Sequence, residues 1–406
     1  MALQAGNQGS DESSLACVIE RGAELKRALV DFALSPRMGR HLERFMVEGA
    51  GPDEVLIEDE AIDAIDRFAL LYRLPNGKTV LDQFLASWPD LSAADREMLR
   101  GWRNPVDGIF EIRGRDGDSL ILLNLVDDLE YRTYSNMGPD AFRPLPKHGF
   151  VYARLVPIGS FPDAWLVSGA MRAYHKSDAA QVAQAALELA TRLPELVHRN
   201  PEKVEQAWQQ MRADRAAFAE FFGCDELVLS PAEADERINA FYRHRQEAAL
   251  AARSARRRPP NIPGVDVPAF ELPPELTDAV TIGVIYDEID GLNFYNEYGM
   301  LRDLFADPAL ASDKQYADVL RGYLRAETIG PLPFRRLAAA HPQTVDAVFR
   351  KVLRQPHFTW ADHGEALLRR RKPWYYEREP RPDRTVIGAR LSELISRYTR
   401  EDLGRR

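Results

Sequence analysis

The fold of this chain is decided by residues 109–135, IFEIRGRDGDSLILLNLVDDLEYRTYS, and by residues 150–171, FVYARLVPIGSFPDAWLVSGAM. Runs of apolar and β-branched side chains are separated here by turn residues such as Asp116-Gly117, which tolerate the positive φ of a tight hairpin. The pattern predicts five short strands. They are Ile109–Gly114, Ser119–Val126, Glu130–Ser135, Phe150–Pro157 and Ala164–Met171.

Most of the remaining chain carries apolar residues at helical spacing. We therefore expect an α+β protein that is mainly α-helical, with one small antiparallel five-stranded β-barrel-like sheet flanked by helical regions. Small closed sheets serve mainly in binding, although a fold alone does not decide a function. The expected organisation is an N-terminal helical region packing on the sheet (1–108), the β-barrel-like module (109–172), a helical region (173–258), a Pro-rich linker (259–274) and a C-terminal helical domain (275–406).

The boundary at 259–274 is predicted from its six prolines. Proline removes backbone donors and favours extended polyproline geometry, so this segment is expected to be a semi-rigid connector. The chain should then consist of two separable halves, 1–258 and 275–406, and limited proteolysis should cut between them.

The composition is that of an ordinary soluble globular protein, with 406 residues, a formal net charge of −9 and 45% hydrophobic residues. No run of 18 apolar residues is present, and the N-terminus lacks the features of a secretory signal. The two cysteines, Cys17 and Cys224, lie far apart in the sequence, which fits a reducing compartment. These observations predict a cytoplasmic, multi-domain protein that does not use a membrane.

One acidic cluster has oxygen ligands of the kind that Mg²⁺, Mn²⁺ or Ca²⁺ prefer. Its carboxylates are Asp287, Glu288, Asp290 and Glu297. The alternative is an ordinary polar loop, in which Asp290-Gly291 turns the chain from an apolar run, Val280–Tyr286, into a helix, Leu292–Ala306. Apart from a divalent cation at this cluster, no cofactor is expected.

The region 313–376 reads as short helix, turn and basic helix, which is the layout of a helix-turn-helix. A wing is expected to follow at residues 358–372. A plain helical bundle would give the same pattern. The candidate side chains for a polyanion or an acidic protein surface, such as residues 48–66 of the same chain, are Arg350, Lys351, Arg354, Arg369, Arg370, Arg371 and Lys372.

No recognised catalytic motif is present: the sequence has no His-Glu-x-x-His, no Gly-x-Ser-x-Gly and no phosphate-binding loop. The sequence therefore favours a non-catalytic binding or adaptor protein with a protein partner over an enzyme. Two alternatives stay open. One is a nucleic-acid-associated regulator that uses the basic helix-turn-helix-like region, and the other is a divalent-metal-dependent hydrolase that uses the acidic cluster.

Overall fold

The computed structural model of the chain describes residues 5–50, 58–145, 148–254 and 270–404. Contacts between Cα atoms divide the chain into two compact units: unit 1 is Met1–Lys203 with Val386–Arg406, and unit 2 is Val204–Thr385. This division differs from the predicted halves, 1–258 and 275–406. The reason is that segments on both sides of the predicted linker pair in one sheet in unit 2.

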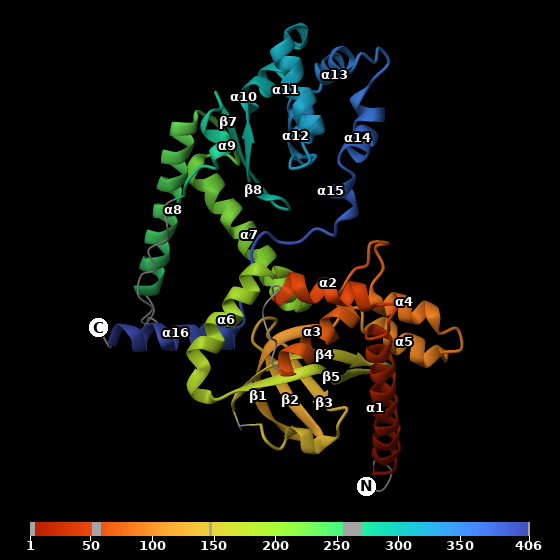
Figure 1. The fold of residues 1–406 in the computed structure, drawn as a ribbon. Coiled ribbons are helices and arrows are strands. Elements are labelled where there is room, and N and C mark those ends of the chain that lie inside the picture. The colour runs from red at the N-terminus through yellow and green to blue at the C-terminus, as the bar shows by residue number, and fades with distance from the viewer. Residues whose placement is uncertain (1–4, 51–57, 146–147, 255–269, 405–406) are drawn as a thin grey trace. The chain divides into compact units, whose positions relative to one another are not determined.

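Unit 1 begins with helices that pack on its sheet (Figure 1). Buried side chains of these helices, among them Leu25, Phe68 and Leu99, contact Val156 and Leu166 of the sheet in one hydrophobic core. The helices are α1 (Ala5–Ala33), α2 (Gly39–Ala50), α3 (Glu58–Leu71), α4 (Val80–Ser87) and α5 (Ala93–Gly101).

The five predicted strands are present in unit 1, although their bounds differ by a few residues. They are β1 (Val106–Asp116), β2 (Ser119–Asn124), β3 (Glu130–Tyr134), β4 (Phe150–Ile158) and β5 (Phe161–Tyr174). The pairing order is β1–β2–β3–β5–β4, and β4 also pairs with β1. The sheet is mixed, because β3 and β5 run parallel. The expectation of a purely antiparallel sheet is therefore wrong: five strands that each pair with two others cannot alternate in direction throughout.

The inner side of this sheet is filled by its own side chains, such as Phe110, Leu122 and Leu155. A further core forms where Ile109 and Phe150 contact two later helices. These helices are α6 (Ala179–Arg192) and α16 (Ala389–Gly404). The short 3-10 helices of unit 1 are η1 (Pro139–Phe142), η2 (Lys176–Asp178) and η3 (Pro194–Arg199).

Unit 2 contains a second sheet, which the sequence did not predict. Its strands are β6 (Glu226–Leu229), β7 (Ile282–Asp287) and β8 (Gly291–Asn296), paired antiparallel in the order β6–β7–β8. The predicted helix Leu292–Ala306 is wrong in its first part. Gly291 takes a φ of 70° and turns the chain back into β8, so that the helix begins only at Tyr298.

The helices of unit 2 pack on both faces of this sheet (Figure 1). One face contacts α7 (Pro201–Phe222) and α8 (Pro231–Ser254) through Phe218, Ile238 and Tyr286. The other face contacts the later helices through Ile285 and Tyr295. The remaining helices are α9 (Pro274–Thr277), α10 (Tyr298–Ala306), η4 (Pro308–Ser312), α11 (Lys314–Arg325), α12 (Leu332–Ala340), α13 (Val345–Leu353), α14 (Trp360–Arg371) and α15 (Pro373–Glu377).

The wing expected at 358–372 is wrong, because most of this stretch forms α14, whose buried Leu367 and Leu368 pack on the core of unit 2. The helix-turn-helix itself stays a prediction. Of the predicted linker, residues 259–269 lie outside the described residues, and Pro274 opens α9.

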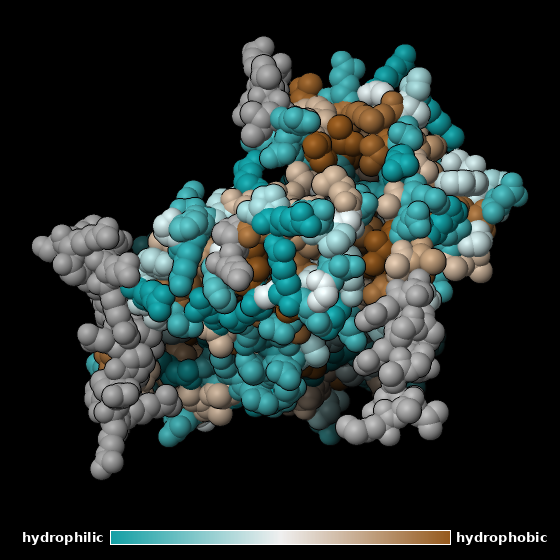
Figure 2. All heavy atoms as spheres, turned by 90° about the horizontal axis from the view of Figure 1, so that it is seen from below, coloured by the Kyte–Doolittle hydropathy of each residue, from teal (hydrophilic) through white to brown (hydrophobic). Residues whose placement is uncertain are grey.

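Exposed apolar side chains are scattered over the described surface. Leu34, Met137 and Leu187 are examples from separate elements. Figure 2 shows one face of the molecule, on which hydrophilic side chains predominate and apolar ones gather in separate patches. Single exposed apolar residues are normal on proteins and by themselves indicate no binding site.

Candidate functional site

The four carboxylates predicted to bind a divalent cation lie around the β7–β8 hairpin without converging. Asp287 Oδ1 accepts the backbone N–H groups of Ile289, at 2.9 Å, and Asp290, at 3.2 Å. Glu288 Oε1 lies 3.2 Å from a guanidinium nitrogen of Arg215. These two carboxylates are therefore engaged by a turn and by an arginine rather than by each other.

The other two carboxylates lie at opposite ends of β8. Asp290 forms an ion pair with Arg378 at 2.7 Å, whereas Glu297 Oε1 accepts a hydrogen bond from the backbone N–H of Val280 at 3.0 Å. Among the described residues, no three His, Cys, Asp or Glu side chains are placed to hold a metal ion. In the structure these carboxylates thus bond to N–H groups and arginines and do not gather around one point, and cation binding stays a prediction.

Of the seven basic side chains predicted to contact a polyanion, some already bond within unit 2. Arg350 donates to the carbonyl oxygen of Phe358 at 2.7 Å, and Lys351 donates to that of Pro308 at 3.0 Å. The guanidinium of Arg369 lies 4.5 Å from the centre of the Tyr376 ring. Three of the seven are exposed, with no hydrogen bond or ion pair within the described residues. They are Arg354, Arg370 and Arg371.

Lys372 cannot contact a polyanion, because its side chain is buried. Its ammonium donates to the carbonyl oxygens of Tyr323, at 2.7 Å, and Ala326, which lie at the C-terminal end of α11. Burial lowers the pKa of Lys372 to about 8. The prediction for this residue is wrong: Lys372 caps a helix, where a cation is favoured by the free carbonyl groups.

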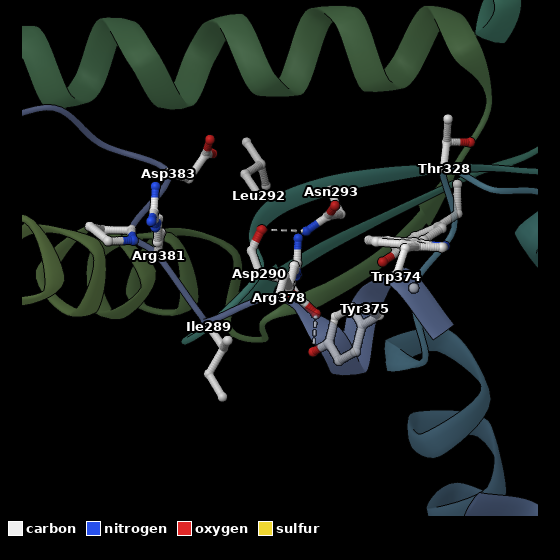
Figure 3. Close-up of a pocket in the computed structure, with 13 residues that line it drawn as sticks. Ile289, Asp290, Leu292, Asn293, Thr328, Trp374, Tyr375, Arg378, Arg381 and Asp383 are labelled. Atoms are coloured by element: carbon white, nitrogen blue, oxygen red, sulfur yellow. Dashed lines mark hydrogen bonds and ion pairs between the residues drawn. The ribbon is translucent and has the colours of Figure 1, made fainter. Parts of the chain in front are cut away.

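The structure brings other residues together at a cavity of about 440 Å³ beside β8 (Figure 3). The lining comes from the β7–β8 hairpin, the loop between α11 and α12, helix α15 and the irregular segment after it. It consists of Ile289, Asp290, Leu292, Asn293, Tyr295, Thr328, Gly330, Trp374, Tyr375, Arg378, Arg381, Pro382 and Asp383.

One wall of this cavity is a network around Asp290. The hydroxyl of Tyr375 donates to Asp290 Oδ2 at 3.0 Å, and Arg378 donates to Oδ1 at 2.7 Å (Figure 3). The guanidinium of Arg378 also lies 4.5 Å from the Tyr375 ring centre and 5.3 Å from that of Trp374. Burial raises the pKa of Asp290, although Tyr375 and Arg378 act in the opposite direction. This wall is thus fixed by bonds among its own side chains.

Two groups in the lining lack such partners. Arg381 is exposed and makes no hydrogen bond or ion pair within the part of the chain that the structure describes. The indole nitrogen of Trp374 is buried with no acceptor among the described residues. A buried N–H without an acceptor is costly, and sites with such groups are where a ligand or solvent oxygen is expected.

A second cavity, of about 420 Å³, lies against the opposite face of β8. It shares Leu292 and Asp383 with the first cavity. Burial raises the pKa of Asp383, although Arg384 acts in the opposite direction. The other residues of its lining are Gln210, Met211, Tyr242, Tyr286, Gly291, Phe294, Arg384 and Thr385.

Among the described lining residues of the two cavities there is no histidine, cysteine or serine, and the aliphatic hydroxyls are those of Thr328 and Thr385. The main groups of the site lie just after Lys372, beyond the side chains predicted from the sequence to bind a partner. The run Trp374-Tyr375-Tyr376, followed by Arg378 and Arg381, was the available signal, because aromatic and arginine side chains are enriched at binding surfaces.

Unit 1 contains a different cluster, which is buried and ionic. Arg154, whose side chain is fully buried, contacts Asp66 at 2.6 Å, Asp107 at 2.7 Å and Asp63 at 3.2 Å. The ammonium of buried Lys26 also contacts Asp66. Burial lowers the pKa of Lys26 and raises that of Asp107.

This cluster joins α1 and α3 to the sheet of unit 1, and Ser168 of β5 donates to Asp66 at 2.8 Å. None of the cavities described above includes its residues. We therefore interpret it as an internal anchor. The sequence predicts an acidic surface at residues 48–66, but Asp63 and Asp66 of this stretch form ion pairs inside the anchor. Residues 51–57 of the same stretch lie outside the described residues.

Within the described parts of the chain, we find no helix that combines the length and the apolar composition of a membrane-spanning segment. Comparisons with protein-family models, with curated proteins and with solved structures found no match to this chain. The candidate function therefore rests on the site alone.

Proposed function

We propose that this chain is a non-catalytic binding protein, and that unit 2 holds a partner polypeptide in the cavity beside β8. The observation that supports this function is the composition of the lining, with Trp374, Tyr375, Arg378 and Arg381 around one hollow. The few residues that dominate binding at protein interfaces are enriched in tryptophan, tyrosine and arginine. Because Asp290 already holds Tyr375 and Arg378, little side-chain entropy is lost on binding.

The chemistry of the lining favours a partner with carboxylate side chains. Arg378 is neutralised by Asp290, whereas Arg381 has no ion pair within the described residues. The lining also contains the carboxylate of Asp383, so an acidic group of the partner has to pair with Arg381 directly. A guanidinium forms two parallel hydrogen bonds with a carboxylate, which gives both energy and orientation. The cavity is also lined by aromatic rings, so an apolar neighbour of that carboxylate would be accommodated.

The proposal is tested by isothermal titration of the full chain with a blocked peptide of alternating glutamate and valine, and with the same peptide carrying lysine for glutamate. We expect binding of the glutamate peptide only. Arg381→Ala should weaken it at least tenfold, because a hydrogen bond to a charged group contributes about 1.5–3 kcal/mol. The matched control is Arg302→Ala, an exposed arginine of α10 outside the lining, which should leave binding unchanged.

Two results would contradict the proposal. One is equal binding of the glutamate and lysine peptides. The other is the absence of measurable binding of either peptide at millimolar concentration.

A second candidate function, contact with nucleic acid, rests on the exposed Arg370 and Arg371 in the last turn of α14. Each neutralised phosphate should contribute about one unit to the slope of log affinity against log salt concentration. We expect the double replacement of Arg370 and Arg371 by alanine to lower retention on DNA and to flatten that slope. Absence of retention of the unaltered chain at low salt would rule this function out.

A further inference from the structure

The strand β8 lies at an edge of the sheet in unit 2. Within the described residues, the sheet has the order β6–β7–β8, and β8 pairs on one side only, with β7. An edge strand presents unpaired N–H and C=O groups to which another strand can bond. Natural edge strands are commonly protected by charged residues or proline, and the sequence of β8, Gly-Leu-Asn-Phe-Tyr-Asn, contains neither.

The register identifies which backbone groups of β8 face outward. Glu297 N–H donates to the carbonyl oxygen of Thr281 at 2.7 Å, and this pair continues the register in which Gly283 lies opposite Tyr295. Hydrogen-bonded pairs alternate with non-bonded pairs in antiparallel sheets. Residues 291, 293 and 295 therefore direct their backbone groups toward β7, and residues 292, 294 and 296 direct theirs away from it.

A side chain supports this assignment. The hydroxyl of Tyr323 donates to the carbonyl oxygen of Asn296 at 2.6 Å, so this carbonyl points away from β7. The N–H and C=O groups of Leu292 and Phe294 have no hydrogen-bond partner in the part of the chain that the structure describes. Two donors and two acceptors are thus free at the outer edge of β8.

The two cavities lie on the two faces of this same edge. Side chains alternate along a strand, so Asn293 and Tyr295 face one side and Leu292 and Phe294 face the other. Asn293 and Tyr295 line the cavity of about 440 Å³, Phe294 lines the cavity of about 420 Å³, and Leu292, next to the turn, lines both. Tyr286, which lies opposite Leu292 in the register, lines the second cavity as well.

We infer that the partner binds by adding a β-strand to the outer edge of β8, and that its side chains enter the two cavities alternately. This inference rests on the proposed function, because it uses the same cavity. An added strand bonds through its backbone and sends successive side chains to opposite faces, so it needs free backbone groups and room on both sides. The edge of β8 offers both.

The lining sets the chemistry of the strand. In the larger cavity, Arg381 can pair with an acidic side chain that keeps clear of Asp383 in the same lining. The smaller cavity offers the rings of Tyr242, Tyr286 and Phe294 to an apolar side chain, beside polar groups of Gln210, Asp383 and Arg384. The paired stretch is short. Asp383 lines both cavities close to Gly291, and the hydroxyl of Tyr323 occupies the carbonyl of Asn296 at the other end. The occupant is therefore a partner segment of alternating acidic and apolar residues, with its backbone bonded to Leu292 and Phe294.

The test uses the unaltered full chain and two N-methylated versions of the blocked glutamate–valine peptide. In one version the methyl groups lie on the amides of the glutamates, and in the other on the amides of the valines. Only one set of amides can face β8 in an added strand. We expect one version to lose at least tenfold in affinity and the other to bind within about threefold of the parent peptide, since the first loses its hydrogen bonds to β8 and the second keeps them.

Equal affinity of the two methylated versions would overturn strand addition. If the parent peptide still binds in that case and Arg381→Ala still weakens its affinity, the proposed function is supported and binding by strand addition is excluded. If the parent peptide does not bind at all, the proposed function itself fails.

Two protein variants make the test independent of peptide chemistry. Leu292→Pro removes one outward N–H, and proline is tolerated at edge positions whose N–H faces away from the sheet. Leu292→Pro should weaken the affinity for the parent peptide at least fivefold relative to Leu292→Ala, and equal affinities of these two variants would count against the inference.

Arg381→Glu should reverse the charge preference, so that this variant binds the lysine–valine peptide better than the glutamate–valine peptide. This change carries no risk to folding, because Arg381 is exposed and unpaired within the described residues.

Discussion

The two Asp-Gly hairpins of this protein, at Asp116-Gly117 and at Asp290-Gly291, share their turn chemistry and differ in what surrounds them. Gly117 has a φ of 58° and Gly291 a φ of 70°, values that glycine adopts without strain. The first hairpin belongs to a sheet in which each strand pairs with two others. The second ends in β8, which pairs with β7 alone among the described residues. The turn residues therefore determine the hairpin, and the strands that follow determine whether an edge stays free.

The sheets also differ in how they are held. In unit 1, a buried arginine with three aspartates joins helices to the sheet. In unit 2, the ion pairs beside β8 lie at the rim of cavities, where Arg378 is 45% exposed. We interpret the first sheet as a stable support and the second as a surface adapted to bind. Changes in unit 1 should affect stability, and changes beside β8 should affect binding.

The largest effect is expected from Arg154→Ala in unit 1. This substitution leaves Asp107 without its cation and buried Asp66 with Lys26 alone, and breaking a buried pair by removing one partner costs about 3–5 kcal/mol. Urea unfolding followed by circular dichroism measures the loss. The matched control is Arg132→Ala, whose ion pair with Asp116 is exposed, so its cost should stay below about 1 kcal/mol. Equal losses for the two variants would remove the distinction between the sheets.

The next effect is the pH dependence of the sheet in unit 1. Asp127 is fully buried, and burial raises its pKa to about 6, although the Tyr131 hydroxyl, the Leu129 N–H and Arg199 oppose this and Asp128 adds to it. Because the pKa of Asp127 is higher in the folded than in the unfolded state, the protonated carboxyl adds its full stabilisation below about pH 4. This part of the free energy of unfolding, about 3 kcal/mol, is lost as the pH rises through about 6.

Asp127→Asn isolates this contribution. The free energy of unfolding of the unaltered chain, measured by urea between pH 4 and 7, should fall relative to that of the variant as the pH rises. Parallel curves for the two proteins would show that Asp127 does not titrate in this range.

The sequence was informative where strands follow one another closely. In residues 109–171, the strands follow one another through short turns, except for the longer segment with η1 between β3 and β4, so local patterns were sufficient. The sheet of unit 2 was missed because β6 has four residues and pairs with β7 more than fifty positions later. The stretch Leu292–Asn296 also lacks strict alternation of apolar and polar residues, and it was read as the start of a helix.

The candidate site could be predicted only in part, for a physical reason. Asp290 was singled out for metal binding, because its partners in the structure, Tyr375 and Arg378, are more than eighty residues away in the sequence. The burial of Lys372 could not be predicted either, since the carbonyl oxygen of Tyr323 that accepts its hydrogen bond lies on α11. A cavity assembled from distant segments has no local sequence pattern, whereas a hairpin has one.

The two hairpin glycines provide the most direct comparison. Gly117→Ala should cost about 1–2 kcal/mol, because the left-handed conformation is unfavourable for alanine while the space around it is open. Gly291→Ala should cost more, since its Cβ would also lie 3.1 Å from Asp383 Oδ2. Thermal unfolding of both variants measures the difference. A cost for Gly291→Ala no greater than that for Gly117→Ala would indicate that the contact with Asp383 is easily displaced.

The smallest effect on stability, and the most informative about function, is expected from the two arginines of the larger cavity. Arg378→Ala removes the ion pair of Asp290, whose side chain is 11% exposed, and should cost about 1 kcal/mol because the arginine itself is partly solvated. Arg381→Ala removes a side chain that is exposed and unpaired within the described residues, so the free energy of unfolding should change by less than about 0.5 kcal/mol. Both substitutions should weaken the affinity for the glutamate–valine peptide. A side chain of a binding surface contributes to binding and little to folding. A large loss of stability in Arg381→Ala would therefore assign Arg381 a structural role, like that of the buried ion pairs of unit 1.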